Sequence, residues 1–246
     1  MPRKVDSVVY LGSKRRIGRQ LRDAILARVP RGERRLYTEP FCGGLGMFCF
    51  MAHYFEQSRA SDAQLSLILM WEAVKNGWTP PRRITRAEYE ALRNVAPSPL
   101  KGFAGYTCSY GGKWFGSYVG EDSKYETDRK RLERGRAVII SQGEYLSLNR
   151  VALAHLDYRH ITVTAGEVVY CDPPYAGTFR YKGHESFDST EFWATCESWK
   201  VKGAHVFVSE YSAPSDWTEI LKVEVALKNA KLNRGRMVEE KLFTLE

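Results

Sequence analysis

The strongest chemical signal lies at residues 167–175, where the chain reads EVVYCDPPY. A hydrophobic run that predicts a buried strand is followed by Asp172, Pro173, Pro174 and Tyr175. The two prolines fix φ and remove two N–H donors, so the turn is stiff and presents carbonyl acceptors. Asp172 and the carbonyl of Pro173 could accept both hydrogens of an exocyclic amino group, and Tyr175 could stack on a planar base. We favour this interpretation over an ordinary turn in which Asp172 only caps a helix.

A second signal is the glycine-rich segment EPFCGGLG at residues 39–46, which follows a predicted strand. Glycines at this point let a ligand approach the backbone and open the N-terminus of a helix. Asp62 ends the next predicted strand about twenty residues later, where an acid reaches the ribose hydroxyls in a Rossmann-like site. The alternative role for Asp62, a helix N-cap, is the commoner one for such a residue taken alone.

A third, weaker signal is the segment YLGSK at residues 10–14, ahead of a predicted helix. Tyr10 could pack on a cofactor, and Lys14 could pair with the cofactor's carboxylate. Taken alone, a pentapeptide of this kind is close to background.

These segments lie in an alternation of strands and helices. The predicted strands cover residues 36–41, 58–62, 151–156, 167–171 and 205–209, the last three of them buried. The predicted helices cover residues 19–29, 47–55, 64–76 and 187–200, the last of them entered at Asp188 and Ser189. This order predicts an α/β protein with a parallel, Rossmann-like sheet flanked by helices.

The alternation is interrupted between residues 77 and 136. This stretch carries prolines, glycines and the basic, aromatic run TCSYGGKWFGSYVG, without alternating strands and helices. We therefore predict an inserted domain at 77–136, mostly helical or irregular, between two parts of a catalytic domain at 1–76 and 137–246.

The positive charge of the chain is concentrated in two segments. The net charge is +8 over 246 residues, and residues 1–36 alone hold eleven Lys/Arg against three Asp/Glu. Residues 76–136 hold twelve against seven. Such an uneven distribution is typical of a face that binds a polyanion, although charge alone leaves a generic basic protein equally open.

Composition also narrows the class of protein. The five cysteines form no CxxC pair and the five histidines no HxxxH pattern, so we expect neither a disulfide framework nor a metal site. The absence of a long apolar run and of a signal-peptide pattern predicts a soluble, cytoplasmic protein without a membrane partner.

The order of these motifs resembles that of the Dam-type DNA adenine-N6 methyltransferases, the alpha-ordered group common in bacteria and phages. Y-x-G-x-K comes first, then E-P-F-x-G-G, a long insert and D-P-P-Y. The resemblance continues in DYR at 157–159, FD at 187–188, FW at 192–193 and SEYSAP at 209–214. Leu45 departs from it, because it stands where the commoner F-x-G-x-G form has its second glycine, so we expect an adjusted loop.

The resemblance implies S-adenosylmethionine as the methyl donor. The residues expected around this donor are Tyr10, Lys14, Asp62 and Asp172, with Phe41, Gly43 and Tyr158 near its adenosine. The turn at 172–175 would orient the target amino group, whose nitrogen is a poor nucleophile because its lone pair is delocalised into the ring.

The resemblance also implies double-stranded DNA as the partner. The target base would leave the helix, and Tyr175 would replace the lost stacking. The insert would recognise the target, through Lys113, Arg129, Lys130 and Arg131 at phosphates and Tyr110, Trp114, Phe115 and Tyr118 at bases. At least half of these aromatic residues are expected instead in a small core of the insert.

Three other functions remain as alternatives. A cytosine-N4 methyltransferase also acts on an amino group through an S/D-P-P-Y motif, although the leading Asp favours adenine. A DNA-binding protein that has lost turnover would share the same fold. A nucleotide-dependent dehydrogenase would explain neither the D-P-P-Y turn nor the basic insert.

Overall fold

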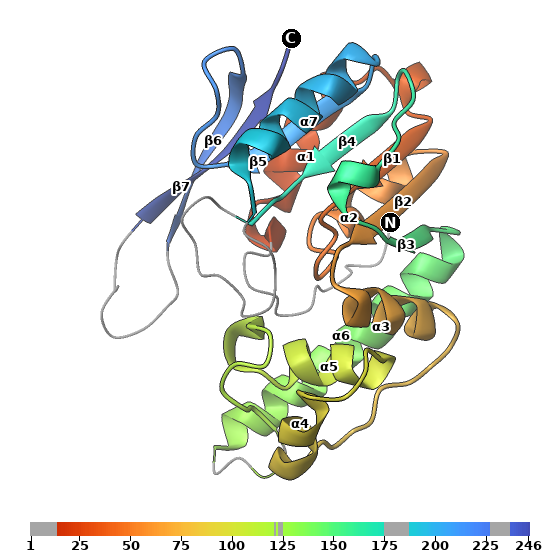
Figure 1. Ribbon diagram of the computed structural model, residues 1–246, viewed down its shortest axis with the longest axis vertical. Helices are drawn as coiled ribbons and strands as arrows, with labels where there is room; N and C mark the ends of the chain where they lie inside the picture. Colours follow the sequence, from red (N-terminus) through yellow and green to blue (C-terminus); the bar gives the residue numbers. More distant parts are fainter. Residues whose placement is uncertain (1–13, 121, 123–124, 175–186, 227–236) are drawn as a thin grey trace.

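The computed structural model of the 246-residue chain describes residues 14–120, 122, 125–174, 187–226 and 237–246. Its centre is a seven-stranded sheet with the strand order β3-β2-β1-β4-β5-β7-β6 (Figure 1). The strands are β1 Leu36–Glu39, β2 Gln57–Asp62, β3 Ala152–His155, β4 Val168–Cys171, β5 His205–Glu210, β6 Thr218–Ala226 and β7 Met237–Thr244. Strands β1 to β5 are parallel, whereas β7 is antiparallel to both β5 and β6.

The direction in which the sheet grows reverses between β1 and β4. From β1 the chain adds β2 and β3 on one side, and then returns to add β4 and β5 on the other. Open α/β sheets bind ligands at the carboxyl ends of the strands where this reversal occurs. The glycine-rich loop follows β1 and the D-P-P-Y turn follows β4, so both motifs lie at that point.

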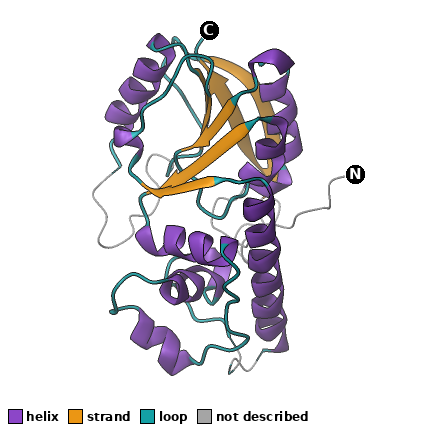
Figure 2. Cartoon of the chain, turned by 90° about the vertical axis from the view of Figure 1, so that its right-hand side faces the viewer, coloured by secondary structure: helices purple, strands orange, loops and turns teal. Residues whose placement is uncertain are grey.

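Helices cover both faces of the sheet (Figure 2). The α-helices are α1 Gly18–Leu26, α2 Phe48–Met51, α3 Leu65–Lys75, α4 Arg86–Leu92, α5 Pro99–Thr107, α6 Glu126–Leu148 and α7 Ser189–Val201. Short 3-10 helices lie at Lys14–Arg16, Arg31–Glu33, Ala52–Tyr54, Tyr110–Gly112 and Tyr158–His160. The predicted α/β architecture and its four predicted helices are confirmed, and Asp188 caps α7 by accepting the N–H groups of Thr190 and Glu191. No helix in the described part of the chain is long and apolar enough to cross a membrane.

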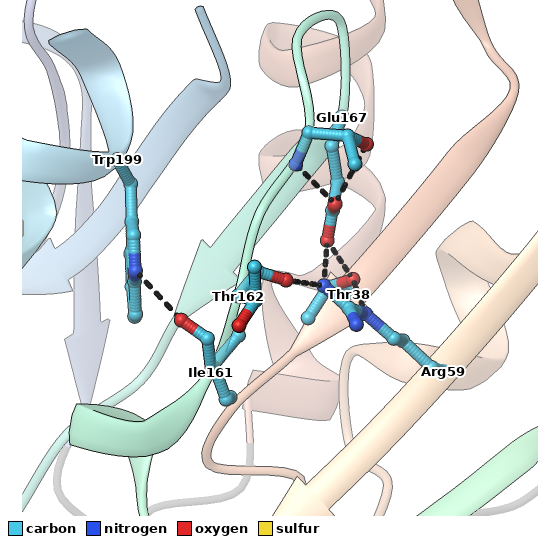
Figure 3. Close-up of polar contacts among 7 residues, drawn as sticks. Thr38, Arg59, Ile161, Thr162, Glu167 and Trp199 are labelled. Atoms are coloured by element: carbon cyan, nitrogen blue, oxygen red, sulfur yellow. Dashed lines mark hydrogen bonds and ion pairs between the residues drawn. The ribbon is translucent and has the colours of Figure 1, made fainter. Parts of the chain in front are cut away.

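A buried polar network joins the strands that carry the two motifs (Figure 3). The carboxylate of Glu167, at the start of β4, accepts hydrogen bonds from the Thr38 hydroxyl of β1 at 2.5 Å and from Arg59 of β2 at 2.6 Å. Arg59 also donates to Thr38 at 2.8 Å and to the carbonyl of Thr162 at 2.6 Å. Because the Glu167 carboxylate is completely buried and needs these donors, the network fixes β1, β2 and β4 relative to one another.

The prediction that residues 151–156 form a buried strand is wrong in one respect. The strand exists as β3, but Ala152, Ala154 and His155 are exposed. The reason is its place in the sheet, because β3 is an edge strand whose single neighbour is β2. The hairpin of β6 and β7 at the opposite edge was not among the predicted elements.

Residues between α3 and β3 form the helices α4, α5 and α6, which lie beside one end of the sheet (Figure 1). Side chains cap the first two of these helices, Thr85 at α4 and Ser98 at α5. The predicted domain boundary at 136 falls inside α6, which continues to Leu148. Tyr89 of α4 and Phe103 of α5 belong to the same buried cluster as residues of α1 and α3, so the helical segment shares its core with one face of the sheet.

Candidate active site

Four carboxyl groups lie at the carboxyl ends of four neighbouring parallel strands. Asp62 ends β2, Glu39 ends β1, Asp172 directly follows β4 and Glu210 ends β5. Because the strands are parallel, these ends meet at one edge of the sheet. The sequence pointed to Asp62 and Asp172 as functional residues. It gave no role to Glu39 or Glu210, although both are acids at the end of a hydrophobic strand.

Lys14 brings the N-terminal motif to the D-P-P-Y turn. Its ammonium lies 2.8 Å from Asp172 and 3.6 Å from Glu240 of β7, and only 3% of the side chain is exposed. Sequence reasoning had assigned Lys14 to the carboxylate of a cofactor and had missed Glu240. The structure shows Lys14 in contact with two carboxylates of its own chain, one of which is the acid that opens the turn, and its role toward a cofactor stays a prediction.

The pKa values of the acids at this edge and of Lys14 are set by burial and by the charges of their neighbours. Burial raises the pKa of Asp172, and the charge of Lys14 offsets part of that increase. Burial alone would lower the pKa of Lys14, but Asp172 and Glu240 outweigh it and the pKa is raised. Burial raises the pKa of Glu210 to about 7, and it raises the pKa of Glu39 well above its usual range. The phenol of Tyr37 donates a 2.5 Å hydrogen bond to Glu39.

The glycine loop is tied to β2 through Asp62. One oxygen of this carboxylate accepts the N–H of Gly43 at 2.9 Å, and the other accepts the N–H of Gln64, also at 2.9 Å. Asp62 therefore satisfies a backbone donor near the start of α3 and also holds the loop.

The loop keeps a glycine-like conformation without the second glycine. Leu45 has a φ of 56°, a left-handed value that costs a residue with a Cβ roughly 1–2 kcal/mol. Its side chain is completely buried, which is worth about 1.5–3 kcal/mol for a leucine. The loop thus retains the left-handed conformation at this position, and burial of the leucine compensates for the strain.

Aromatic rings gather beside the glycine loop. Phe41 and Tyr158 lie with their ring centroids 5.2 Å apart, and Phe187 and Phe192 pack against both of them. Sequence reasoning placed Phe41, Gly43 and Tyr158 near an adenosine. The structure brings the rings of Phe41 and Tyr158 together beside the carboxyl end of β1. Gly43 follows Phe41 by two residues in the loop after β1.

Two of the predicted site residues, Tyr10 and Tyr175, lie outside the described residues. Their assigned roles, packing on the cofactor and stacking on the target base, stay predictions. Pro173 is buried and Pro174 is exposed, so the turn runs from the interior toward solvent.

Of the predicted DNA-binding residues, three lie near the start of α6, and Tyr110 and Lys113 lie in and directly after the 3-10 helix Tyr110–Gly112. Arg129, Lys130 and Lys113 are exposed, but Lys130 pairs with Glu126 of the preceding turn at 2.8 Å. Arg131 lies 3.7 Å from Asp128 and places its guanidinium over the ring of Tyr110, 5.2 Å from the centroid. Tyr110 is 55% exposed.

The remaining aromatic residues of the segment mostly serve packing. Phe115 and Tyr118 are buried against Tyr89, and Trp114 is half-buried against Tyr106. At least half of the insert's predicted aromatic residues are thus packed inside, but the prediction of a separate small core is wrong, because they belong to the core that the helical segment shares with the sheet.

The parallel strands, the glycine loop and the acids at the carboxyl edge define a Rossmann-like α/β protein with a candidate ligand site at the β1/β4 reversal. Residues 10–99 match the family model of the D12 class N6 adenine-specific DNA methyltransferases. This match assigns an enzymatic activity to the chain, methylation of the N6 amino group of adenine in DNA.

The comparison with solved structures gives a distant structural match, and the comparison with curated proteins gives no sequence match. A solved structure of a provisionally assigned methyltransferase from Pseudomonas syringae covers 94% of this chain and 99% of its own, with a TM-score of 0.36 and 9% sequence identity. No curated protein matches the chain significantly.

Proposed function

We propose that this chain is a Dam-type, alpha-group enzyme that transfers the methyl group of S-adenosylmethionine to adenine N6 in double-stranded DNA. The observation that carries the proposal is the 2.8 Å contact between Lys14 and Asp172. It joins the first and last motifs of the alpha order at the end of β4, where the sheet order reverses. A cytoplasmic location accords with a DNA substrate and belongs to the same proposal.

The chain offers suitable groups for the methyl donor. When bound, S-adenosylmethionine supplies an electrophilic methyl group on a sulfonium. The carboxylate of Asp62 lies at the glycine loop and suits the ribose hydroxyls, and the rings of Phe41 and Tyr158 suit an adenine. The backbone at Gly43, with a φ of 44°, carries no side chain that would keep a ligand away.

Asp172 and Pro173 have the central role toward the substrate. Hydrogen bonds from the adenine amino group to the Asp172 carboxylate and the Pro173 carbonyl would direct the nitrogen lone pair away from the ring. The carboxylate also stabilises the positive charge that develops on N6 as the new bond forms. Orientation therefore supplies most of the rate increase, and the chain needs no nucleophile of its own.

Exposed basic residues support a duplex substrate. Arg129 and Lys113 lie on the helical segment whose sequence carries a surplus of five positive charges over residues 76–136. Such groups bind phosphates independently of sequence and place the protein on the duplex. A base inside a duplex is out of reach of Asp172, so the target adenine must leave the stack.

The decisive experiment compares nucleosides from plasmid DNA of cells that express the wild type or Asp172→Asn. We expect N6-methyladenine with the wild type and a loss of at least about 100-fold with the variant, as for removal of a transition-state hydrogen bond. Asp23→Asn, at an exposed position of α1, is the matched control and should retain activity. N4-methylcytosine in place of N6-methyladenine would favour the cytosine alternative. DNA binding without any methylated base would identify a silent relative.

A further inference from the structure

We propose that Glu240 is a positioning residue of the methyl-transfer site, which shares the Lys14 ammonium with Asp172 and thereby sets the charge and orientation of Asp172. The inference rests on the proposed function for the role of Asp172. The contact itself stands on the structure alone.

Glu240 reaches the site from the antiparallel part of the sheet. It belongs to β7, and the next residue, Lys241, pairs with Glu210 at the carboxyl end of β5. The Glu240 side chain is 16% exposed and lies 3.6 Å from the Lys14 ammonium. The terminal hairpin therefore contributes a charged group to an edge that is otherwise formed by parallel strands.

Sharing of the ammonium changes what Asp172 can do. An ammonium donates up to three hydrogen bonds, so Lys14 can serve both carboxylates at once. Lys14 lies closer to Asp172, at 2.8 Å, than to Glu240. Glu240 takes part of the attraction of the Lys14 ammonium. Without Glu240, more of that attraction would fall on Asp172, and the Asp172 carboxylate would become a weaker acceptor for an incoming amino group. Glu240 thus keeps the Asp172 carboxylate a strong acceptor for the amino group.

Glu240 also makes the electrostatic potential at Asp172 and Glu210 more negative. The groups that interact electrostatically with Asp172 come from five elements and their ends: Lys14, Glu39, Tyr170, Cys171, Glu210, Tyr211 and Glu240. The charge of Glu240 raises the pKa of both Asp172 and Glu210. Neutralising Glu240 should therefore move both ionisations to lower pH.

The matched control lies one residue earlier on the same strand. Glu239 pairs with Lys222 of β6 at 2.5 Å, and its side chain is 45% exposed. Since successive residues of a strand point to opposite faces, Glu239→Gln makes the same chemical change on the face away from Lys14.

The test compares Glu240→Gln with Glu239→Gln in single-turnover methyl transfer from pH 5 to 9. For Glu240→Gln we expect the acid limb of the rate profile to move down by on the order of one pH unit. The plateau rate should fall about tenfold, while KM for S-adenosylmethionine stays within about twofold. Glu239→Gln should follow the wild type, and Glu240→Asp should recover part of the rate. Identical profiles for Glu240→Gln and Glu239→Gln would overturn the proposal.

A measurement without turnover separates this inference from the proposed function. In a lysine-ammonium ¹H–¹⁵N spectrum, the Lys14 signal is assigned by its loss in Lys14→Met. It should shift in Glu240→Gln and stay in place in Glu239→Gln. If the wild type makes no N6-methyladenine, the proposed function fails, and this spectrum still decides whether Glu240 holds Lys14. An unmoved Lys14 signal contradicts the contact.

Discussion

The carboxylate of Asp62 accepts the backbone N–H of Gly43 at 2.9 Å, and so the end of β2 holds the glycine loop that follows β1. The same carboxylate accepts the N–H of Gln64 at the entrance to α3. The sequence leaves two alternative roles for Asp62, a helix N-cap and a ligand of the cofactor ribose. The structure shows the capping contact and the contact to the loop, and the role of Asp62 toward a cofactor stays a prediction.

Replacing Asp62 should therefore have two separable effects. Asp62→Ala removes an acceptor of two backbone donors, so we expect the free energy of unfolding to fall by about 1 kcal/mol. If Asp62 also binds the ribose, affinity for S-adenosylmethionine should fall by about 1.5–3 kcal/mol. Calorimetric titration and chemical denaturation measure the two effects. A variant that is less stable but binds the cofactor normally would leave Asp62 as a cap alone.

The left-handed conformation of Leu45 predicts an unusual order of stabilities. In most element interiors an alanine variant is more stable than a glycine variant by roughly 0.5–1 kcal/mol. At φ 56° the order should reverse, because glycine adopts this conformation without strain and alanine does not. The free energy of unfolding, measured by urea denaturation, should thus be about 1 kcal/mol higher for Leu45→Gly than for Leu45→Ala. Both variants should be less stable than the wild type. The usual order at this position would mean that the loop does not hold this conformation in solution.

The raised pKa of Glu210 predicts how stability changes with pH. Its folded pKa is about 7, above the ordinary value of 4.5, so the folded protein binds more protons between these values. The Glu210 contribution to the free energy of unfolding should consequently fall as pH rises from about 4.5 to 7. Glu210→Gln has no such ionisation. Its free energy of unfolding should therefore rise relative to that of the wild type, by on the order of 1–3 kcal/mol, as pH increases across that window. The exposed Glu56 supplies the control, Glu56→Gln, which should follow the wild type.

Neutralising the basic residues at the start of α6 should weaken DNA binding through its salt dependence. The triple variant Arg129→Gln, Lys130→Gln and Arg131→Gln should lower the slope of log affinity against log salt by about 0.9 for each phosphate that the protein no longer neutralises. Arg129 should account for most of the effect, because Lys130 and Arg131 have carboxylate neighbours on their own helix. Lys202→Gln, at an exposed position after α7, serves as the control. An unchanged slope would show that these residues form only a solvated helix face.

Local patterns in the sequence were sufficient for the five parallel strands, for four of the helices and for part of the site. Hydrophobic runs that end in acids identified β4 and the turn at Asp172, because strand periodicity and proline chemistry act over a few neighbouring residues. The glycine loop and Asp62 could be placed for the same reason. Their roles toward a ligand rested on the order of the motifs along the chain.

Contacts between distant segments lay beyond those patterns. The exposure of β3 depends on its edge position, and the role of Glu240 depends on an antiparallel strand that returns beside β5. Likewise, Lys14 could be recognised as a charged residue near a helix, but not as the buried partner of two half-buried carboxylates. A residue's own neighbours in the chain do not specify which strand lies beside it. Charge and burial at this site are therefore settled by how the sheet is assembled.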